Sequence, residues 1–394
     1  GEGIAKIDNF TIFIPETIKG EKVRVLIVKV LSSHGFGKVI EILEKSQARQ
    51  DVDCNTYKRC GGCNLRHVKY EETLKMKQNA VQSLVNKTLK NKLQIKETVG
   101  MENPLHYRNK AQYPIGINKK GEPVIGVFAN RTHEVIPIDN CLIQNKKSEE
   151  IAKFIIEFIK EKNISIYDEK KGKGLVRHIV TKVGIKTGEI MCVIVINGHK
   201  IPNENELVEN LKTRYPEIKA IVKNINMKNT NVILGQENIN LYGNGYIEDI
   251  LGEYKFKISP LSFYQVNPVQ AEKLYNLGVS MAEITKNDVV FDLYCGIGTI
   301  SLFMSKFAKK VYGIEIVEEA VKMAKENAQN NNVSNTEFFA GDVEIVLDDL
   351  INNKGLKADV VMFDPPRKGL DKKSIDNILN IRPKKIVYIS CNPA

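Results

Sequence analysis

The stretch DVVFDLYCGIGT, residues 288–299, decides the fold of the C-terminal third of the chain. Its short apolar run predicts a buried parallel strand, and Gly296 and Gly298 then allow the backbone to turn tightly and to approach a ligand closely. A dinucleotide-binding loop would carry a third glycine at position 301, where Ser301 stands. A carboxylate before the turn, Asp292, also suits a ligand with an ammonium group better than a pyrophosphate. The stretch therefore predicts the first strand and the ligand loop of an α/β domain.

From about residue 260 onward, short apolar runs alternate with helical stretches. The runs typical of buried parallel strands are Asp288–Leu293, Lys310–Ile314, Thr336–Phe339, Ala358–Phe363 and Lys384–Ile389. Helical patterns separate them at 298–307, 317–330 and 371–380. This alternation predicts a doubly wound α/β domain, in which ligands bind at the carboxyl ends of the strands.

Acidic residues stand at the ends of the next two predicted strands. Glu315 ends the second strand, where a carboxylate can accept both ribose hydroxyls, and Asp342 ends the third, where it can accept the adenine amine. Taken singly, each acid could equally be a solvated loop residue or a helix cap. As an ordered set with Asp292 and the glycine turn, they resemble the class I S-adenosylmethionine (SAM) methyltransferase fold. We therefore expect SAM as the cofactor.

Two further motifs follow the fourth and fifth predicted strands: DPPR at Asp364–Arg367 and SCNP at Ser390–Pro393. Amine-directed methyltransferases usually place an aromatic residue where Arg367 stands. A cysteine at a strand end has a different use, because a thiolate that adds to carbon 6 of uracil makes carbon 5 nucleophilic enough to attack a methyl donor. Cys391 is therefore a candidate nucleophile, and a small buried core residue is the plain structural alternative.

These motifs, together with SFYQVN at Ser262–Asn267, resemble the RNA uridine C5-methyltransferase family over essentially the whole chain. The resemblance implies that Cys391 is the nucleophile of a SAM-dependent methylation at uridine carbon 5. It also implies cofactor contacts at the matching loop and strand-end residues. The predicted cofactor-binding residues are Gln265, Asp292, Tyr294, Gly296, Gly298, Thr299, Glu315, Asp342 and Asp364.

The N-terminal residues 1–46 predict a small β-barrel. Its short strands are Phe10–Ile14, Lys22–Val30 and Lys38–Leu43, with Gly35 and Gly37 as punctuation before the last one. Within the family resemblance, this barrel is similar to the TRAM domain, an RNA-binding module of the oligonucleotide-binding type.

The remaining boundaries follow from composition and periodicity. Residues 47–69 and 98–258 predict a central α+β domain that carries iron–sulfur ligands and contacts RNA, and 70–97 predicts a helix, over Tyr70–Leu93, that docks on the catalytic domain. The methyltransferase domain spans 259–394. The elements expected in the central domain are strands Val124–Phe128, His178–Val183 and Ile190–Ile196 and helices Glu149–Lys160 and Glu204–Arg214.

Four of the seven cysteines form a pattern that favours a metal cluster. Cys54, Cys60 and Cys63 lie within ten residues, and Cys141 follows 78 positions later. Structural zinc usually shows two close ligand pairs, whereas three clustered cysteines with a distant fourth suit an iron–sulfur cluster better. A redox-active CxxC pair would need a thioredoxin-like context that is missing here.

The family resemblance extends this interpretation. Its ribosomal-RNA branch carries a [4Fe–4S] cluster on this cysteine pattern, and its transfer-RNA branch generally lacks both the cluster and the TRAM domain. The resemblance therefore implies a [4Fe–4S] cofactor and methylation of 23S ribosomal RNA, with transfer RNA as the alternative substrate. The other two cysteines, Cys192 and Cys295, are expected to be structural.

The charge balance is consistent with an RNA partner. The chain of 394 residues holds 58 Lys and Arg against 47 Asp and Glu, a net charge of +11, although a generally lysine-rich composition would give the same excess. The target uridine is expected to be single-stranded or flipped out, because a stacked base hides carbons 5 and 6. Candidates for phosphate or base contacts are Tyr57, Lys58, Arg59, Arg66, His67, Lys69, Tyr107, Arg108 and Lys110.

Other features narrow the class of protein. The sequence has no run of about 18 apolar residues and no secretory leader, so we expect no membrane span. An odd number of unevenly spaced cysteines predicts a protein of the reducing cytoplasm. We also expect a monomer. The family places its general base, a glutamate, beyond Ala394, so we expect a C-terminally truncated chain that binds cofactor without completing turnover.

Three alternatives to the uridine methyltransferase remain. An amine-directed nucleic-acid methyltransferase would fit the fold but not Arg367 and Cys391. A non-catalytic RNA-binding scaffold would not need the intact acidic set. A redox enzyme would need a flavin or second-cluster motif, which the sequence lacks.

Overall fold

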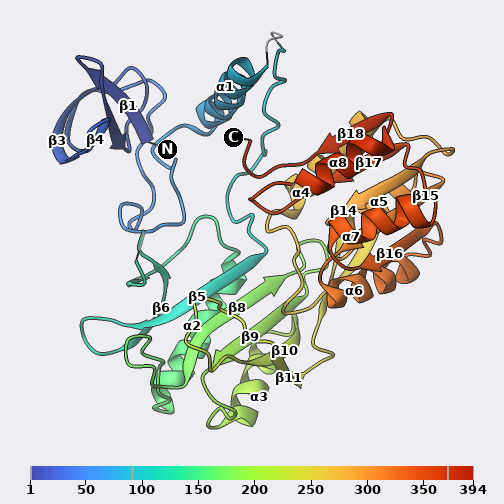
Figure 1. The fold of residues 1–394 in the computed structure, drawn as a ribbon. Helices are drawn as coiled ribbons and strands as arrows, with labels where there is room; N and C mark the ends of the chain where they lie inside the picture. Colours follow the sequence, from blue (N-terminus) through green and yellow to red (C-terminus); the bar gives the residue numbers. More distant parts are fainter. Residues whose placement is uncertain (1, 90–92, 131, 371, 394) are drawn as a thin grey trace. The chain divides into compact units, whose positions relative to one another are not determined.

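The computed structural model describes residues 2–89, 93–130, 132–370 and 372–393 (Figure 1). The chain divides into two compact units. The first unit holds Gly1–Pro104 and Ile125–Leu142, and the second unit holds Leu105–Val124 and Ile143–Pro393. Each unit is described by itself.

The second unit contains the parallel sheet that the sequence predicts. Its strands follow the order β16-β15-β14-β17-β18, and every neighbouring pair is parallel. The chain thus starts in the middle of the sheet, moves to one edge and then returns to build the other, which confirms the doubly wound α/β prediction. The strands are β14 Val289–Leu293, β15 Lys310–Glu315, β16 Thr336–Ala340, β17 Val360–Phe363 and β18 Lys385–Tyr388.

Helices cover both faces of this sheet. Side chains alternate between the faces, so Val290 joins one apolar cluster and its neighbour Phe291 joins the other. The first cluster takes residues from α4 Pro268–Ala282, α5 Thr299–Ser305 and α6 Glu318–Asn330. The second takes residues from α7 Val343–Asp348, from the π-helical turn Asp349–Asn353 that follows it, and from α8 Lys372–Ile381.

A second, mostly antiparallel sheet precedes the parallel sheet in the same unit. Within the second unit its strands follow the order β11-β10-β9-β8-β5, and of these only β9 and β10 pair in parallel. Strand β9 is buried throughout, so it reads as a continuous apolar run instead of an alternating one. The strands are β5 Lys110–Ile117, β8 Val176–Val183, β9 Ile190–Ile196, β10 Ile218–Ile225 and β11 Glu237–Tyr242, and the helices are α2 Lys146–Glu161 and α3 Glu204–Arg214.

A hairpin links this sheet to the parallel sheet. Strands β12 Ile247–Leu251 and β13 Tyr254–Ile258 pair antiparallel. Phe256 of the hairpin is fully buried in the same apolar cluster as Val193 of β9 and Tyr275 of α4. One continuous core therefore joins the two sheets of the second unit.

The first unit begins with a four-stranded sheet of order β1-β2-β4-β3. Its strands are β1 Glu2–Ile7, β2 Phe10–Pro15, β3 Lys22–Val30 and β4 His34–Glu44. The prediction that Gly35 and Gly37 punctuate the chain before the last strand is wrong, since both lie within β4. A Cβ on Gly37 would stand 2.3 Å from the Val25 side chain of β3, so the glycine permits close strand packing.

Among its described residues, the rest of the first unit comprises one helix, most of one hairpin and irregular loops. Helix α1 spans Tyr70–Thr88, and residues 90–92, at the end of the predicted helix, lie outside the described residues. Its docking on the catalytic domain stays a prediction. Strands β6 Pro123–Phe128 and β7 Val135–Pro137 pair antiparallel. Within the described residues, no helix is long and apolar enough to cross a membrane.

Candidate active site

The loop between β14 and α5 has the tight geometry that its glycines predict. Tyr294, Gly296 and Gly298 all adopt positive φ, at 66°, 55° and 83°. A Cβ on Gly296 would meet no heavy atom within 4 Å, so the space beside this residue is open. The backbone therefore offers a ligand a close approach at the carboxyl end of the central strand.

Asp292, at the carboxyl end of β14, is a fully buried carboxyl group. Its Oδ2 accepts a hydrogen bond from Ser301 Oγ. Its Oδ1 is also buried and has no hydrogen-bond partner among the described residues. Burial, reinforced by the nearby Asp364 and Glu315, raises the pKa of Asp292 to about 7 against the opposing effect of Ser301. An orphaned buried carboxylate oxygen fits the ammonium group of an amino-acid ligand such as the methionine part of SAM.

Glu315 fixes the glycine loop from the neighbouring strand. Its Oε2 accepts a hydrogen bond from the Gly296 amide at 3.1 Å, and its Oε1 accepts one from the Val317 amide at 2.9 Å. Each carboxylate oxygen has a second lone pair, so the same group can still accept ribose hydroxyls.

Asp342 has an ordinary structural role in this structure. It is the N-cap of α7, and its Oδ1 accepts a hydrogen bond from the Glu344 amide at 2.9 Å. The helix-cap alternative therefore applies to Asp342, and its contact with adenine stays a prediction.

Gln265 and Asp364 meet although they lie 99 residues apart in the sequence. The Gln265 Nε2 donates to Asp364 Oδ2 at 3.4 Å. The backbone of the Gln265 segment is held from the antiparallel sheet, because the Asn109 side chain donates to the Gln265 carbonyl at 3.0 Å and the Asn109 amide donates to the Val266 carbonyl at 2.9 Å. The second unit thus brings Gln265 to the strand ends of the parallel sheet.

Tyr275 is a site residue that the sequence analysis missed. It is buried on α4, and its hydroxyl lies within hydrogen-bonding reach of Thr299 and Gln265. Burial raises the pKa of Tyr275 to about 12, while these two neighbours act to lower it. The signal available was Asn267-Pro268, an N-cap followed by proline in the first turn, which marks the start of the unpredicted helix α4.

Cys391 follows the edge strand β18 beside the end of β17. In the parallel register Phe363 pairs with Tyr388, and the Ile389 amide donates to the Phe363 carbonyl at 3.0 Å. The segments that carry Asp364 and Cys391 therefore leave the sheet as neighbours. Cys391 is exposed in this structure, and its role as nucleophile stays a prediction. By contrast, Cys192 and Cys295 are buried, as structural cysteines would be.

The four clustered cysteines lie together in the first unit. Cys54, Cys60, Cys63 and Cys141 are all half-buried. Burial raises the pKa of Cys63 to about 11, and the thiols of Cys141, Cys60 and Cys54 are close enough to raise it as well. Across the described residues, no three His, Cys, Asp or Glu side chains are arranged to hold a metal ion. The thiols are neighbours, but they do not converge on one point.

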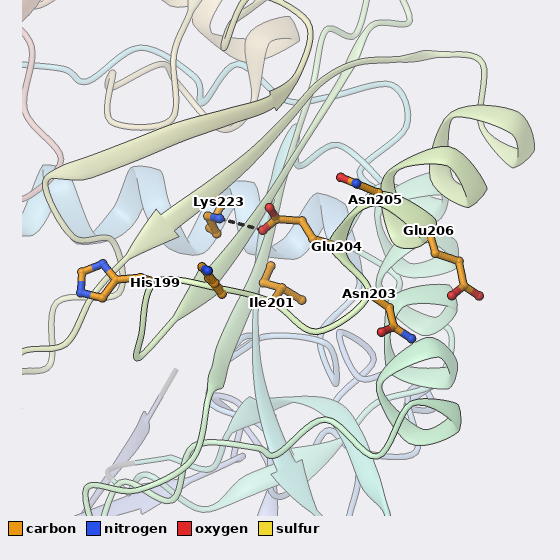
Figure 2. A pocket seen from close by; sticks show the side chains of 8 residues that line it. His199, Ile201, Asn203, Glu204, Asn205, Glu206 and Lys223 are labelled. Carbon is orange, nitrogen blue, oxygen red and sulfur yellow. Dashed lines mark hydrogen bonds and ion pairs between the residues drawn. The ribbon is translucent and has the colours of Figure 1, made fainter.

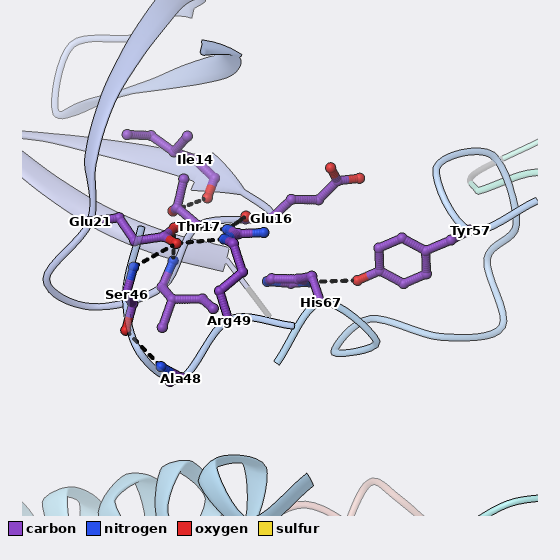
Figure 3. Close-up of polar contacts among 10 residues, drawn as sticks. Ile14, Glu16, Thr17, Glu21, Ser46, Ala48, Arg49, Tyr57 and His67 are labelled. Carbon is purple, nitrogen blue, oxygen red and sulfur yellow. Dashed lines mark hydrogen bonds and ion pairs between the residues drawn. The ribbon is translucent and has the colours of Figure 1, made fainter. Parts of the chain in front are cut away.

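Buried polar contacts support the cysteine loop (Figure 3). The Tyr57 hydroxyl and His67 Nδ1 form a buried hydrogen bond of 2.7 Å. Burial lowers the pKa of His67 to about 4, so the imidazole is neutral. Five residues before Cys54, Arg49 Nη2 donates to Glu21 Oε2 and to the Glu16 carbonyl, both at 2.7 Å. These contacts tie the loop to the four-stranded sheet.

A hollow on the antiparallel sheet lies apart from the strand-end residues. It is lined by residues of the β9–α3 connection, by the start of α3 and by Lys223 of β10. Figure 2 shows Lys223 turned toward Glu204, and their ion pair measures 2.8 Å. The one buried cation of the hollow is therefore already neutralised, and none of the predicted site residues lines it.

Comparisons with known proteins find relatives along the whole chain. Residues 69–394 match the family tRNA (Uracil-5-)-methyltransferase, and residues 1–40 match the TRAM domain. The chain is 50% identical to an uncharacterized RNA methyltransferase of Clostridium acetobutylicum, covering all of this chain and 86% of that protein. It is 44% identical to an uncharacterized RNA methyltransferase of Staphylococcus aureus, covering 100% and 87%.

A solved structure that resembles this chain contains S-adenosyl-L-homocysteine, the product that SAM leaves after methyl transfer. The tRNA (uracil-54, C5)-methyltransferase of Pyrococcus abyssi, in complex with S-adenosyl-L-homocysteine, matches with a TM-score of 0.76 at 26% identity, covering 100% of this chain and 90% of that one. The family match over most of the chain and this structural likeness together show the kind of enzyme to which the chain belongs. The chain belongs to the tRNA (uracil-5-)-methyltransferase family and is a SAM-dependent RNA (uracil-C5)-methyltransferase with an N-terminal TRAM domain.

Proposed function

We propose that Cys391 is the nucleophile of this methylation and that the strand-end residues around it hold the cofactor. The observation that carries the proposal is the register of β17 and β18, which places an exposed thiol beside the segment of Asp364. Asp364 in turn contacts Gln265, and Asp292 offers a buried oxygen without a partner.

The chemistry requires a temporary bond between the protein and the base. The Cys391 thiolate adds to carbon 6 of the uracil ring, and the displaced electron pair gives carbon 5 carbanion character. SAM supplies the electrophilic methyl group that carbon 5 takes up. A base then removes the proton from carbon 5, and the returning electron pair expels the thiolate from carbon 6. The thiol therefore ends the cycle unchanged.

The residues of the cofactor loop bind and orient. Asp292 is suited to accept hydrogen bonds from the amino-acid ammonium, and Glu315 to accept them from the ribose, while Gly296 leaves room for the backbone to approach. Tyr275, whose hydroxyl lies within hydrogen-bonding reach of Thr299 and Gln265, would orient these two side chains.

We also propose that Cys54, Cys60, Cys63 and Cys141 ligate a [4Fe–4S] cluster. Each cysteine of such a cluster binds a different iron atom, so four neighbouring thiols need not converge on one point as they must around a single ion. Four half-buried thiols that perturb one another fit this requirement. The cluster would cross-link the cysteine loop to the segment around Cys141 and so stabilise the first unit.

The proposed RNA substrate is 23S ribosomal RNA, supported by the cysteine pattern together with the TRAM domain. Transfer RNA is a second candidate, because the Pyrococcus abyssi enzyme that acts on uracil 54 of tRNA aligns with the whole of this chain. Architecture alone therefore does not separate the two substrates, and the choice needs a direct assay.

The assay offers the chain labelled SAM with unmodified transcripts of 23S ribosomal RNA and of tRNA. Label on the RNA is counted both as free product and as covalent protein–RNA complex. We expect label on ribosomal RNA at a uridine, none with C391A, and wild-type incorporation with C192A, whose thiol is buried in the antiparallel sheet.

Each other outcome removes one part of the proposal. Label on tRNA alone would replace the substrate and keep the chemistry. Label on an exocyclic amine, or wild-type incorporation by C391A, would overturn Cys391 as the nucleophile.

A further inference from the structure

Two lysines stand directly opposite each other inside the second unit. The antiparallel register of β5 and β8 pairs Lys110 with Lys182. Lys182 is only 4% exposed, and Lys110 is half-buried. Like charges at directly opposed positions destabilise a sheet, and burial adds to the cost because the charges lose hydration. A fold that keeps such a pair has a use for it.

No carboxylate neutralises this pair within the described residues. Lys182 Nζ donates to two neutral oxygens, the carbonyls of Ser259 at 2.7 Å and Ser262 at 2.8 Å. Burial lowers the pKa of Lys182 well below its usual range, and the charge of Lys110 lowers it further. The pKa of Lys110 is lowered by burial and then by Arg108. The positive charges of neighbouring basic side chains thus lower the pKa values of both lysines, and no carboxylate among the described residues offsets them.

Arg108 adds an unsatisfied donor. It precedes Lys110 by two residues, and its Nε is buried without a hydrogen-bond partner in the described structure. A guanidinium donor buried in this way costs free energy unless a ligand completes it. Arg108 is also the residue type that pairs best with phosphate oxygens, because its donors form a planar fork.

This basic cluster, Arg108, Lys110 and Lys182, adjoins the segment that carries Gln265. Asn109, between the two half-buried members Arg108 and Lys110, hydrogen-bonds the backbone of Gln265 and Val266. Lys182 holds the preceding residues of the same segment through its two carbonyl contacts. A small crevice is lined by both parts, since Lys110, Lys182 and Tyr264 all contribute to it. The cluster is therefore built onto the wall of the candidate active site.

We propose that Arg108, Lys110 and Lys182 form an anion subsite that takes a backbone phosphate of the RNA strand beside the target uridine. Arg108 and Lys110 are the direct ligands, and Lys182 holds the Gln265 segment and adds charge. The inference rests on the RNA methyltransferase activity and adds the residues that bind the RNA backbone beside the target uridine. A phosphate there would neutralise the like-charge pair and complete Arg108 Nε.

The test measures binding of a fluorescein-labelled 12-nucleotide oligouridylate between 50 and 300 mM KCl. The variants are K110M and R108M, with K119M as a control that removes the same charge from an exposed turn after β5. Each lost phosphate contact should lower the slope of log K against log salt by about 0.7 and weaken binding roughly tenfold at moderate salt. K119M should keep the slope and affinity of the wild type.

Thermal unfolding distinguishes a binding role from a structural one. K110M removes a like-charge pair, so its melting temperature should equal or exceed that of the wild type while its RNA affinity falls. A melting temperature that drops, together with an unchanged salt slope in K110M and R108M, would overturn the subsite, and so would a wild-type chain that does not bind the oligouridylate at 50 mM KCl.

The methylation chemistry is read separately, from the covalent complex with Cys391. A complex that forms normally while both variants keep the wild-type slope removes the subsite alone. A lowered slope without any covalent complex keeps the phosphate contact and removes the proposed role of Cys391.

Discussion

The cofactor loop of the second unit and the cysteine loop of the first unit are both candidate ligand sites, but they are held in different ways. The cofactor loop leaves a sheet whose parallel register brings Asp292, Glu315 and Asp364 to one edge. The cysteine loop, residues 54–63, contains no helix or strand and depends on side-chain contacts such as Tyr57 with His67. A site at strand ends is fixed by backbone pairing, whereas a loop site needs its ligand or its neighbours to set the geometry.

The largest expected effect is that of D292N, which should weaken SAM binding at the cofactor loop while it stabilises the fold. D292N removes a buried carboxylate that accepts the ligand ammonium, so SAM affinity should fall by roughly 100-fold or more, as for other truncated buried charge pairs. The same change should stabilise the free protein at pH 8, by at most about 4 kcal/mol, because Asp292 no longer ionises in a buried position.

The sign of that stability effect follows from the pKa of Asp292, which rises from 3.8 to about 7 on folding. The folded chain retains a proton that the unfolded chain has lost, so this stabilisation is complete below pH 3.8 and is lost as the pH rises to 7. Titration calorimetry and thermal unfolding measure the two effects, with the exposed Asp376→Asn as control. Unchanged SAM affinity in D292N would remove Asp292 from the site.

The second prediction concerns the cysteine loop. Y57F leaves His67 Nδ1 buried without its partner, so the free energy of unfolding should fall by about 1–3 kcal/mol. SAM affinity should stay within twofold of the wild type, because Tyr57 and His67 belong to the first unit and the cofactor loop belongs to the second. Y388F, which alters an exposed tyrosine, should leave stability unchanged. A large loss of SAM affinity in Y57F would contradict the comparison.

The third prediction is a pH dependence confined to the cofactor loop. Binding of the ligand ammonium needs the Asp292 carboxylate, and its pKa in the free protein is about 7. SAM affinity should therefore fall about tenfold for each pH unit below 7. Affinity that stays constant from pH 8 to pH 5.5 in titration calorimetry would show that another group binds the ammonium.

The smallest expected effect tests the buried tyrosine beneath the loop. Y275F removes the hydroxyl within reach of Thr299 and Gln265 and keeps the ring that packs against Phe303. The loss of about 1 kcal/mol for one neutral hydrogen bond corresponds to a roughly fivefold rise in the dissociation constant for SAM. Stability should change little. A variant that loses stability but binds SAM normally would make Tyr275 a core residue only.

The difference between the two regions also explains what the sequence could predict. The strands around Asp292 and Glu315 are short apolar runs between helices, so their type and their shared edge follow from periodicity and topology. Contacts across long separations do not follow in this way. The approach of Asn109 to Gln265 and the pairing of Lys110 with Lys182 depend on tertiary packing and strand register, which no local pattern encodes.

One local signal was misread because packing overrides it. Gly35 and Gly37 look like turn residues, yet both lie in β4, and at Gly37 the Val25 side chain leaves no space for a Cβ. Asp342 satisfies the pattern of a cofactor ligand and also caps α7 in this structure, so its contact with the cofactor stays a prediction. A short polar side chain at a strand–helix junction can meet either need, so its type alone does not decide between them.

The most direct test of the account is covalent trapping on RNA substituted with 5-fluorouridine. Fluorine at carbon 5 cannot leave as a proton does, so the bond between the thiol and carbon 6 should persist after methyl transfer. We predict a denaturation-resistant complex whose peptide, identified by mass spectrometry, carries the methylated fluorouridine on Cys391. A complex mapped to another cysteine, or labelled SAM consumed with no complex at all, would contradict the central role of Cys391.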